Sequence, residues 1–227
     1  MHGVQETSSL PRTIWTIAHL LIVCAVAWLY FGNGIQTIGR LAGVALQDGD
    51  PGRRVVLMAF SVILFARMTY TAFGLLERRF DWSECVAVIG AVAFYQFGFA
   101  LMGATSTAPL GISDLAAVSL FALGGYLNTG SEIERKRFKQ DPANKGKLYT
   151  QELFVLVRHP NYLGDIVWAL GWALMTRNGW ALFIPAIAAC GFIVMFIPQL
   201  FSYLAERYGQ QYREWAGRTK RLIPFLY

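Results

Sequence analysis

Charged residues and cysteines are scarce in this sequence. Only 15% of its 227 residues are Asp, Glu, Lys or Arg, whereas 55% are hydrophobic. A chain this apolar excludes a soluble domain of ordinary composition and indicates a polytopic membrane protein. The three cysteines fall in apolar segments without metal-type spacing, so we expect small core residues and no metal centre. The N-terminus lacks a cationic region followed by a cleavage site, so the first apolar run is expected to be a retained helix.

Six apolar segments have about the 20 residues that a membrane-spanning helix needs. They cover residues 14–31, 55–76, 83–103, 112–128, 160–175 and 180–203. The fourth passes into charged sequence without a proline, so its helix is expected to continue to about Lys139. A short interfacial helix is expected within residues 32–54 and an amphipathic stretch at 204–219. The pattern predicts an all-α, polytopic membrane helix bundle of about six (six or seven) transmembrane helices, forming one membrane domain over residues 1–227.

Lysine and arginine are distributed unevenly among the predicted loops. With the N-terminus inside, the cytoplasmic segments hold fifteen of these residues and the opposite segments hold four. This predicts an even number of spans with cytoplasmic N- and C-termini. The net charge of +6 suits loops that face anionic lipid better than it suits a nucleic-acid partner. We expect a multi-pass protein of the inner or plasma membrane if the source is bacterial, with no nucleic-acid partner and no obligate protein partner.

Two groups of polar residues lie where apolar helices meet the predicted cytoplasmic interface. The first follows positions i, i+4, i+7 and i+11 of one helix stripe: Asn128, Glu132, Arg135 and Lys139. The second surrounds the start of the fifth helix: Arg158, His159, Asn161, Tyr162 and Asp165. A helix N-terminus and basic side chains suit an anionic ligand, and amides and carboxylates can bind ribose hydroxyls or amides. The alternative interpretation is that these charges are ordinary interfacial anchors.

These residues resemble the C-terminal signature of a superfamily of membrane enzymes. RHPNYLGD before an apolar helix, then YGQQYREW and RLIPFLY, is similar to three groups: the steroid 5-alpha-reductases, the sterol C14 and delta-7 reductases, and the isoprenylcysteine carboxyl methyltransferases. The upstream segment LNTGSEIERKRFKQDPANKGKLYTQELF resembles the reductase branch, especially the steroid 5-alpha-reductase-like DUF1295 proteins. The resemblance covers about residues 124–227. We therefore expect residues 1–110 to form the substrate side and residues 111–227 to bind the cofactor.

The resemblance implies an NADPH-dependent reductase of a carbon–carbon double bond in a hydrophobic enone, such as a sterol, a steroid or an isoprenoid lipid. It implies that Arg135 and Lys139 bind the phosphates of NADPH at the cytoplasmic face. The other implied cofactor contacts are Asn128, Glu132, Arg158, His159, Asn161, Tyr162 and Asp165. The cofactor supplies hydride, and an acid near the substrate carbonyl supplies the proton.

The sequence departs from the reductase pattern in two places. Steroid reductases polarise the enone with a Glu and a Tyr in the N-terminal half, and the candidate catalytic residues here are Tyr70, Arg67 and Glu77. Arg67 is interpreted equally well as half of a structural ion pair. Residues 200–202 (Leu-Phe-Ser) stand where the relatives carry charged or histidine residues. Two other functions stay open: an S-adenosylmethionine-dependent lipid or thiol methyltransferase, and a non-catalytic lipid-binding protein with the same fold.

Overall fold

The structure, a computed structural model, describes residues 8–227 and is helical, with no strand in that range. The predicted all-α class is therefore confirmed. The chain divides into two compact units, each of which is described by itself. The first unit comprises the chain up to Val118 together with Trp172–Leu182, and the second comprises Ser119–Gly171 together with Phe183–Tyr227.

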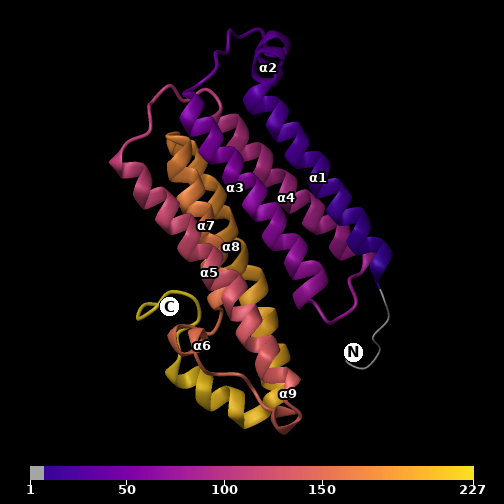
Figure 1. The fold of residues 1–227 in the computed structure, drawn as a ribbon. Coiled ribbons are helices and arrows are strands. Elements are labelled where there is room, and N and C mark those ends of the chain that lie inside the picture. The colour runs from indigo at the N-terminus through magenta and orange to yellow at the C-terminus, as the bar shows by residue number, and fades with distance from the viewer. Residues whose placement is uncertain (1–7) are drawn as a thin grey trace. The chain divides into compact units, whose positions relative to one another are not determined.

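Three long helices pack side by side in the first unit (Figure 1). They are α1 (Ser9–Phe31), α3 (Pro51–Tyr70) and α4 (Trp82–Gly103), and α3 continues as a π-helical turn over Thr71–Leu75. Proline at the first position of α3 loses no hydrogen bond there, and the Asp50 carboxylate caps the helix by accepting from Arg53 N at 2.8 Å. The short helix expected within residues 32–54 is α2 (Gly34–Ala42), and its place at the membrane interface stays a prediction.

A buried ion pair closes one end of the first unit. Arg53 is one of the four loop cations predicted to lie opposite the cytoplasm, but its side chain is fully buried. Its Nη1 lies 2.9 Å from Asp114 Oδ1, and the same guanidinium donates to the carbonyl oxygens of Ala108 and Pro109 at 3.0 and 3.1 Å and of Met175 at 2.8 Å. This one side chain therefore connects three segments that are far apart in sequence.

The second unit is built on α5 and α7, with α8 and α9 completing it. Its helices are the part of α5 (Ile112–Gln140) from Ser119, α6 (Leu153–Leu156), α7 (Pro160–Thr176) as far as Gly171, α8 (Phe183–Gly191) and α9 (Ile197–Arg218). A short 3-10 turn covers Pro142–Asn144, and a π-helical turn over Phe192–Phe196 joins α8 to α9; a second 3-10 turn, Gly179–Leu182, belongs to the first unit. A Cβ atom added at Gly164 of α7 would lie 2.4 Å from the backbone N of Asn128, and one at Gly124 of α5 would lie 2.1 Å from the backbone N of Trp168. The backbones of α5 and α7 are thus in direct contact.

Helix α9 bends at Gly209, whose φ of 55° and ψ of −126° lie in a region that glycine alone adopts readily. Beyond the bend, Tyr212 and Trp215 are buried against Tyr149 and Phe154. The predicted amphipathic stretch therefore folds back as a helix over the loop that follows α5.

Within residues 8–227, four helices are long and apolar enough to cross a membrane: Ser9–Phe31, Pro51–Leu75, Trp82–Gly103 and Gly179–Arg218. They support an integral membrane protein, and many of their large apolar side chains are exposed, as lipid-facing side chains are. The other two predicted spans are helical, but α7 has only 17 residues and serine, glycine and asparagine dilute the apolar part of α5. The count of six spans, the orientation and the single-domain division stay predictions.

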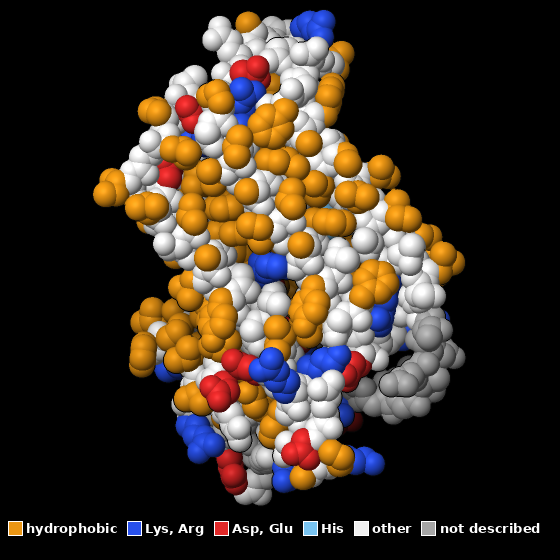
Figure 2. Space-filling model, viewed as in Figure 1, with side chains coloured by type: hydrophobic (Ala, Val, Ile, Leu, Met, Phe, Trp, Pro, Cys, Tyr) orange, Lys and Arg blue, Asp and Glu red, His pale blue; other side chains and the backbone are white. Residues whose placement is uncertain are grey.

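Side-chain types are segregated on the surface that Figure 2 shows. Apolar side chains cover the helices of the first unit on this face. In the second unit, Lys, Arg, Asp and Glu gather around α6 and the end of α9 (Figures 1 and 2). The nine residues predicted to bind the cofactor belong to the second unit.

Candidate functional site

The two predicted polar groups meet through one amide and one carboxylate. Asn128 on α5 donates through Nδ2 to Asp165 Oδ1 on α7 at 2.8 Å and to the carbonyl oxygen of Asn161 at 3.2 Å. Asp165 Oδ1 also accepts from Trp168 Nε1 at 2.9 Å. The close crossing of α5 and α7 at Gly124 and Gly164 brings these groups within reach. The carboxylate is thus held in one orientation by two neutral donors, as a fixed binding group requires.

The charged end of α5 is more open. Glu132 and Arg135 form an i,i+3 ion pair, in which the Arg135 side chain is 43% exposed, and Lys139 is exposed. Exposed pairs of this kind add little to stability, so Glu132 and Arg135 can exchange their ion pair for contacts with a ligand at small cost. The phosphate-binding roles of Arg135 and Lys139 stay predictions.

Arg158 and His159 are held by the C-terminal tail. Arg158 N donates to the carbonyl oxygen of Lys220 at 2.8 Å, and His159 N donates to that of Arg221 at 3.2 Å. The tail therefore lies along the segment that precedes α7 and brings the Arg221 side chain near both residues. Sequence reasoning named the tail as a signature but did not assign Arg221 to the site.

Arg158 is a buried cation without an acidic partner. Its side chain is 7% exposed, its guanidinium carbon lies 5.9 Å from the centre of the Phe201 ring, and no carboxylate among residues 8–227 pairs with it. Burial lowers the pKa of Arg158, and the positive charge of Arg221 acts in the same direction, while the Tyr212 and Tyr227 phenols oppose it. A buried positive charge beside a second one is costly unless an anion joins it. The pair is therefore suited to an anionic ligand.

His159 is neutral at ordinary pH. It is 3% exposed, and its Nε2 has no hydrogen-bond partner within the described chain. Burial, together with the charges of Arg158 and Arg221, lowers the pKa of His159 to about 4. Its ring stacks on Tyr162 at 5.5 Å between centroids, and Tyr162 stacks on Phe192 at 4.4 Å. An aromatic column thus fixes an imidazole with one nitrogen available to a ligand.

This low pKa predicts a pH dependence of stability. Unfolded His159 binds a proton below about pH 6.5, whereas the folded residue does so only below about pH 4. The unfolded state therefore binds more protons between these values, and stability falls as the pH falls through this window, by about 3 kcal/mol in all. Thermal unfolding of the detergent-solubilised protein at pH 4.5–7.5 should show this loss relative to His159→Asn, in which the group is absent. Parallel pH profiles for the two proteins would contradict the assignment.

More than half of the sequence, including all nine residues predicted to bind the cofactor, matches a known protein family. The family described as "Protein of unknown function (DUF1295)" matches residues 82–219, more than half of the chain. The chain belongs to the DUF1295 family. This confirms the resemblance drawn from RHPNYLGD and the tail.

Named relatives of this DUF1295 protein include both methyltransferases and reductases. It is 53% identical over 55 residues to the probable O-methyltransferase ustE of Ustilaginoidea virens, covering 24% of this chain and 19% of the relative. It is 32% identical over 80 residues to protein-S-isoprenylcysteine O-methyltransferase B of Arabidopsis thaliana, covering 35% and 41%. It is 24% identical over 161 residues to delta(14)-sterol reductase TM7SF2 of Mus musculus, covering 62% and 38%. The chain spans less than half the length of each of these relatives.

The predicted catalytic residues of the DUF1295 protein lie in the first unit, apart in sequence from the nine cofactor residues of the second. Arg67 and Tyr70 end α3, where Tyr70 is 50% exposed, and Glu77 follows the π-helical turn and is also exposed. Their catalytic roles stay predictions.

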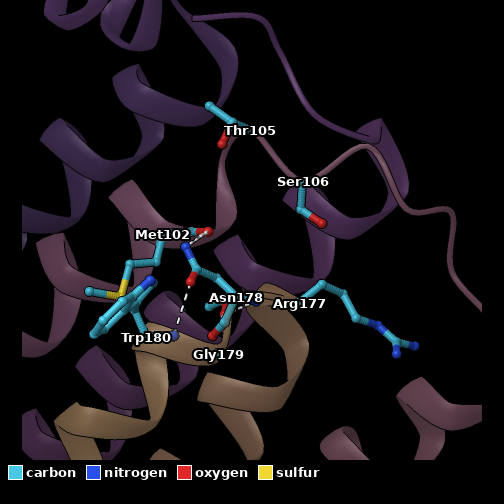
Figure 3. A pocket seen from close by; sticks show the side chains of 8 residues that line it. Met102, Thr105, Ser106, Arg177, Asn178, Gly179 and Trp180 are labelled. Carbon is cyan, nitrogen blue, oxygen red and sulfur yellow. Dashed lines mark hydrogen bonds between the residues drawn. The ribbon is translucent and has the colours of Figure 1, made fainter.

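A cavity of about 530 Å³ also lies in the first unit (Figure 3). In it the Asn178 side chain accepts from Trp180 N at 3.0 Å and reaches the Met102 carbonyl oxygen at 3.5 Å. It is lined by Met102, Thr105, Ser106, Thr176, Arg177, Asn178, Gly179 and Trp180, none of which is a predicted site residue. Because no residue predicted to bind a ligand lines this cavity, we place the candidate site at the buried Arg158 and its neighbours instead.

Besides Arg221, three residues of the candidate site in the second unit were not predicted from the sequence: Trp168, Phe192 and Phe201. The i,i+3 spacing of Asp165 and Trp168 could have indicated the indole as a donor. Phe201, in the segment that departs from the relatives, places its ring beside Arg158, so an aromatic contact stands where a polar one was expected. Phe192 gave no signal, because its stacking on Tyr162 depends on how α8 packs.

Proposed function

We propose that this protein is an NAD(P)H-dependent reductase of a carbon–carbon double bond in a hydrophobic, enone-containing lipid of the sterol or isoprenoid type. The observation that carries the proposal is the buried Arg158 with Arg221 beside it and no carboxylate partner. NADPH carries several phosphate charges, which would compensate this excess of positive charge. S-Adenosylmethionine carries a sulfonium cation and no phosphate, so the same cluster would disfavour it.

The remaining second-unit residues fit the other parts of a nucleotide. The fixed Asp165 carboxylate and the Asn128 amide can bind hydroxyl and amide groups, and the free Nε2 of His159 can form a hydrogen bond with one more polar group. The Tyr162–Phe192 stack offers an aromatic edge beside these groups. When bound, the nicotinamide supplies hydride, and the chain's own residues bind and orient the cofactor. The match to the sterol reductase also extends over more of this chain than the two methyltransferase matches do.

A methyltransferase is the second candidate. The 53% identity to a probable O-methyltransferase favours it, although this match covers only 24% of the chain. In that case the same Asn128, His159 and Asp165 cluster would bind S-adenosylmethionine, and the substrate would be a lipid or thiol.

Ligand binding to purified protein in detergent separates these functions. We expect NADPH to raise the unfolding temperature and S-adenosylmethionine to leave it unchanged. Arg158→Gln should weaken NADPH binding about 10–100-fold, as loss of a charged hydrogen bond does. It should not destabilise the unliganded protein, because it removes an uncompensated buried cation.

The matched control is Arg213→Gln, which removes an exposed arginine from the same unit and should change the NADPH affinity by less than about two-fold. A shift with S-adenosylmethionine and none with NADPH would replace the reductase by the methyltransferase. A protein that binds neither NADPH nor S-adenosylmethionine would support the lipid-binding alternative.

A further inference from the structure

The first unit contains a polar cluster that the cofactor site does not use. It joins His19 on α1, Ser61 on α3 and Gln96 on α4, and each of these residues is at most 1% exposed. The Gln96 carboxamide forms hydrogen bonds with the other two residues. Polar side chains inside apolar helices are costly and mark functional positions unless they satisfy one another.

The hydrogen bonds of Gln96 fix the tautomer of His19. Gln96 Nε2 donates to the Ser61 carbonyl oxygen at 3.3 Å, and Gln96 Oε1 accepts from the Ser61 hydroxyl, so the orientation of the amide is set. The nitrogen of this amide faces His19 Nε2 at 3.1 Å. His19 Nε2 must then be the acceptor, which places the hydrogen of the neutral ring on Nδ1. Nδ1 is buried and has no partner among the described residues.

A second donor lies one helical turn away. The Trp15 indole is 2% exposed, and its Nε1 likewise has no partner in the described chain. The Trp15 and His19 rings are 5.6 Å apart between centroids, and Phe65 presents its ring edge to His19 at 5.1 Å. Two neighbouring rings in aromatic surroundings thus each carry a buried N–H donor that has no acceptor among the described residues, whereas buried donors in native proteins are nearly always paired.

We propose that Trp15 and His19 form a binding site for the carbonyl oxygen of an apolar ligand. A ketone oxygen accepts two hydrogen bonds and brings no donor of its own, so it satisfies both N–H groups. An alcohol would add a hydroxyl hydrogen for which this aromatic environment offers no acceptor, and a carboxylate would add a buried charge. The site therefore selects a ketone over the corresponding alcohol or acid.

Phe65 is the half-buried residue whose ring packs against the fully buried imidazole, at 5.1 Å between centroids. We infer that a ligand reaching Nδ1 displaces this ring. The choice of an enone as the ligand rests on the proposed function, whereas the donor pair itself does not.

Infrared spectroscopy of a bound, carbonyl-labelled ligand tests the proposal. The probe is a steroidal 4-en-3-one with ¹³C at the ketone, added to the detergent-solubilised protein without any nucleotide. We expect the carbonyl band to shift to lower frequency on binding, and the shift to be lost in His19→Phe and reduced in Trp15→Phe. Phe65→Ala should tighten binding several-fold, and the same steroid without its 3-oxygen should bind at least ten-fold more weakly than the ketone.

The matched control is Trp28→Phe, which changes an exposed tryptophan of the same helix and should leave the carbonyl band unchanged. Equal affinity for the ketone and its deoxygenated analogue, or the same carbonyl band in the wild type and in Trp15→Phe, would overturn the proposal and leave the cluster structural. If His19→Phe does not fold, the carbonyl band in Trp15→Phe and the ketone affinity of Phe65→Ala still test the proposal.

The two proposals fail independently. A band shift that depends on Trp15 and His19 in a protein that does not bind NADPH keeps the ketone site and removes the reductase. NADPH binding without such a shift removes the ketone site and keeps the reductase.

Discussion

Replacement of Asp114 by alanine is expected to lower the free energy of unfolding by about 3–5 kcal/mol, because it leaves the Arg53 guanidinium buried without its counter-ion. The loss should be visible as a lower unfolding temperature in detergent. It should also loosen the loop 104–111, since the carbonyl oxygens of Ala108 and Pro109 are bound by the same side chain. Protease accessibility of that loop is the second measurement.

The control is Asp48→Ala, which breaks the more exposed pair between Asp48 and Arg54. It should change the free energy of unfolding by no more than about 1 kcal/mol. Replacing both partners, as Arg53→Met with Asp114→Leu, should recover much of the stability lost in Asp114→Ala. An Asp114→Ala protein as stable as Asp48→Ala would show that the pair contributes nothing.

The second large effect is expected for Gly164→Ala. The added Cβ would lie 2.4 Å from the backbone N of Asn128, so α5 and α7 have to separate. We expect a loss of about 1–3 kcal/mol of stability, typical of an overpacked contact. Because the same separation lengthens the bond between Asn128 and Asp165, NADPH binding should weaken along with stability.

Gly90→Ala in α4 is the matched control, since an added Cβ there meets nothing within 4 Å. The higher helix propensity of alanine should leave it neutral or stabilising by up to about 1 kcal/mol. If Gly164→Ala also proves neutral, the crossing of α5 and α7 is looser than described.

Local patterns predicted the helices well. Pro160 marks the start of α7, and the uninterrupted run from Ile112 predicted the long α5. The helical spacing of the two polar groups placed Asn128 and Asp165 at the same interface, and the two residues are hydrogen-bonded. These features depend on residues close in sequence, where helix periodicity applies. Arg53 shows the limit, because its burial depends on carbonyl groups 55 to 122 residues away and no local pattern distinguishes it from a loop cation.

The site was predicted in part for the same reason. Arg158 and His159 stood out as polar residues before an apolar helix, but their lack of an acidic partner appears only once the tail lies beside them. The donor pair of Trp15 and His19 could not be derived from the sequence, since the state of His19 depends on residues of two other helices. Whether a buried polar group has a hydrogen-bond partner depends on the tertiary structure, and sequence periodicity does not encode it.

The backbone angles of Gly209 set the direction of the part of α9 that follows the bend. Trp215 lies six residues beyond the bend, or about 9 Å at 1.5 Å per residue, so a rotation of about 10° at Gly209 would move it by about 1.6 Å. Lys220 and Arg221, which accept hydrogen bonds from Arg158 N and His159 N, follow directly after α9 and would move with it. The position of the cationic cluster is therefore set by one pair of backbone angles as well as by local packing. Variation at Gly209 should retune the ligand site without changing any residue in it.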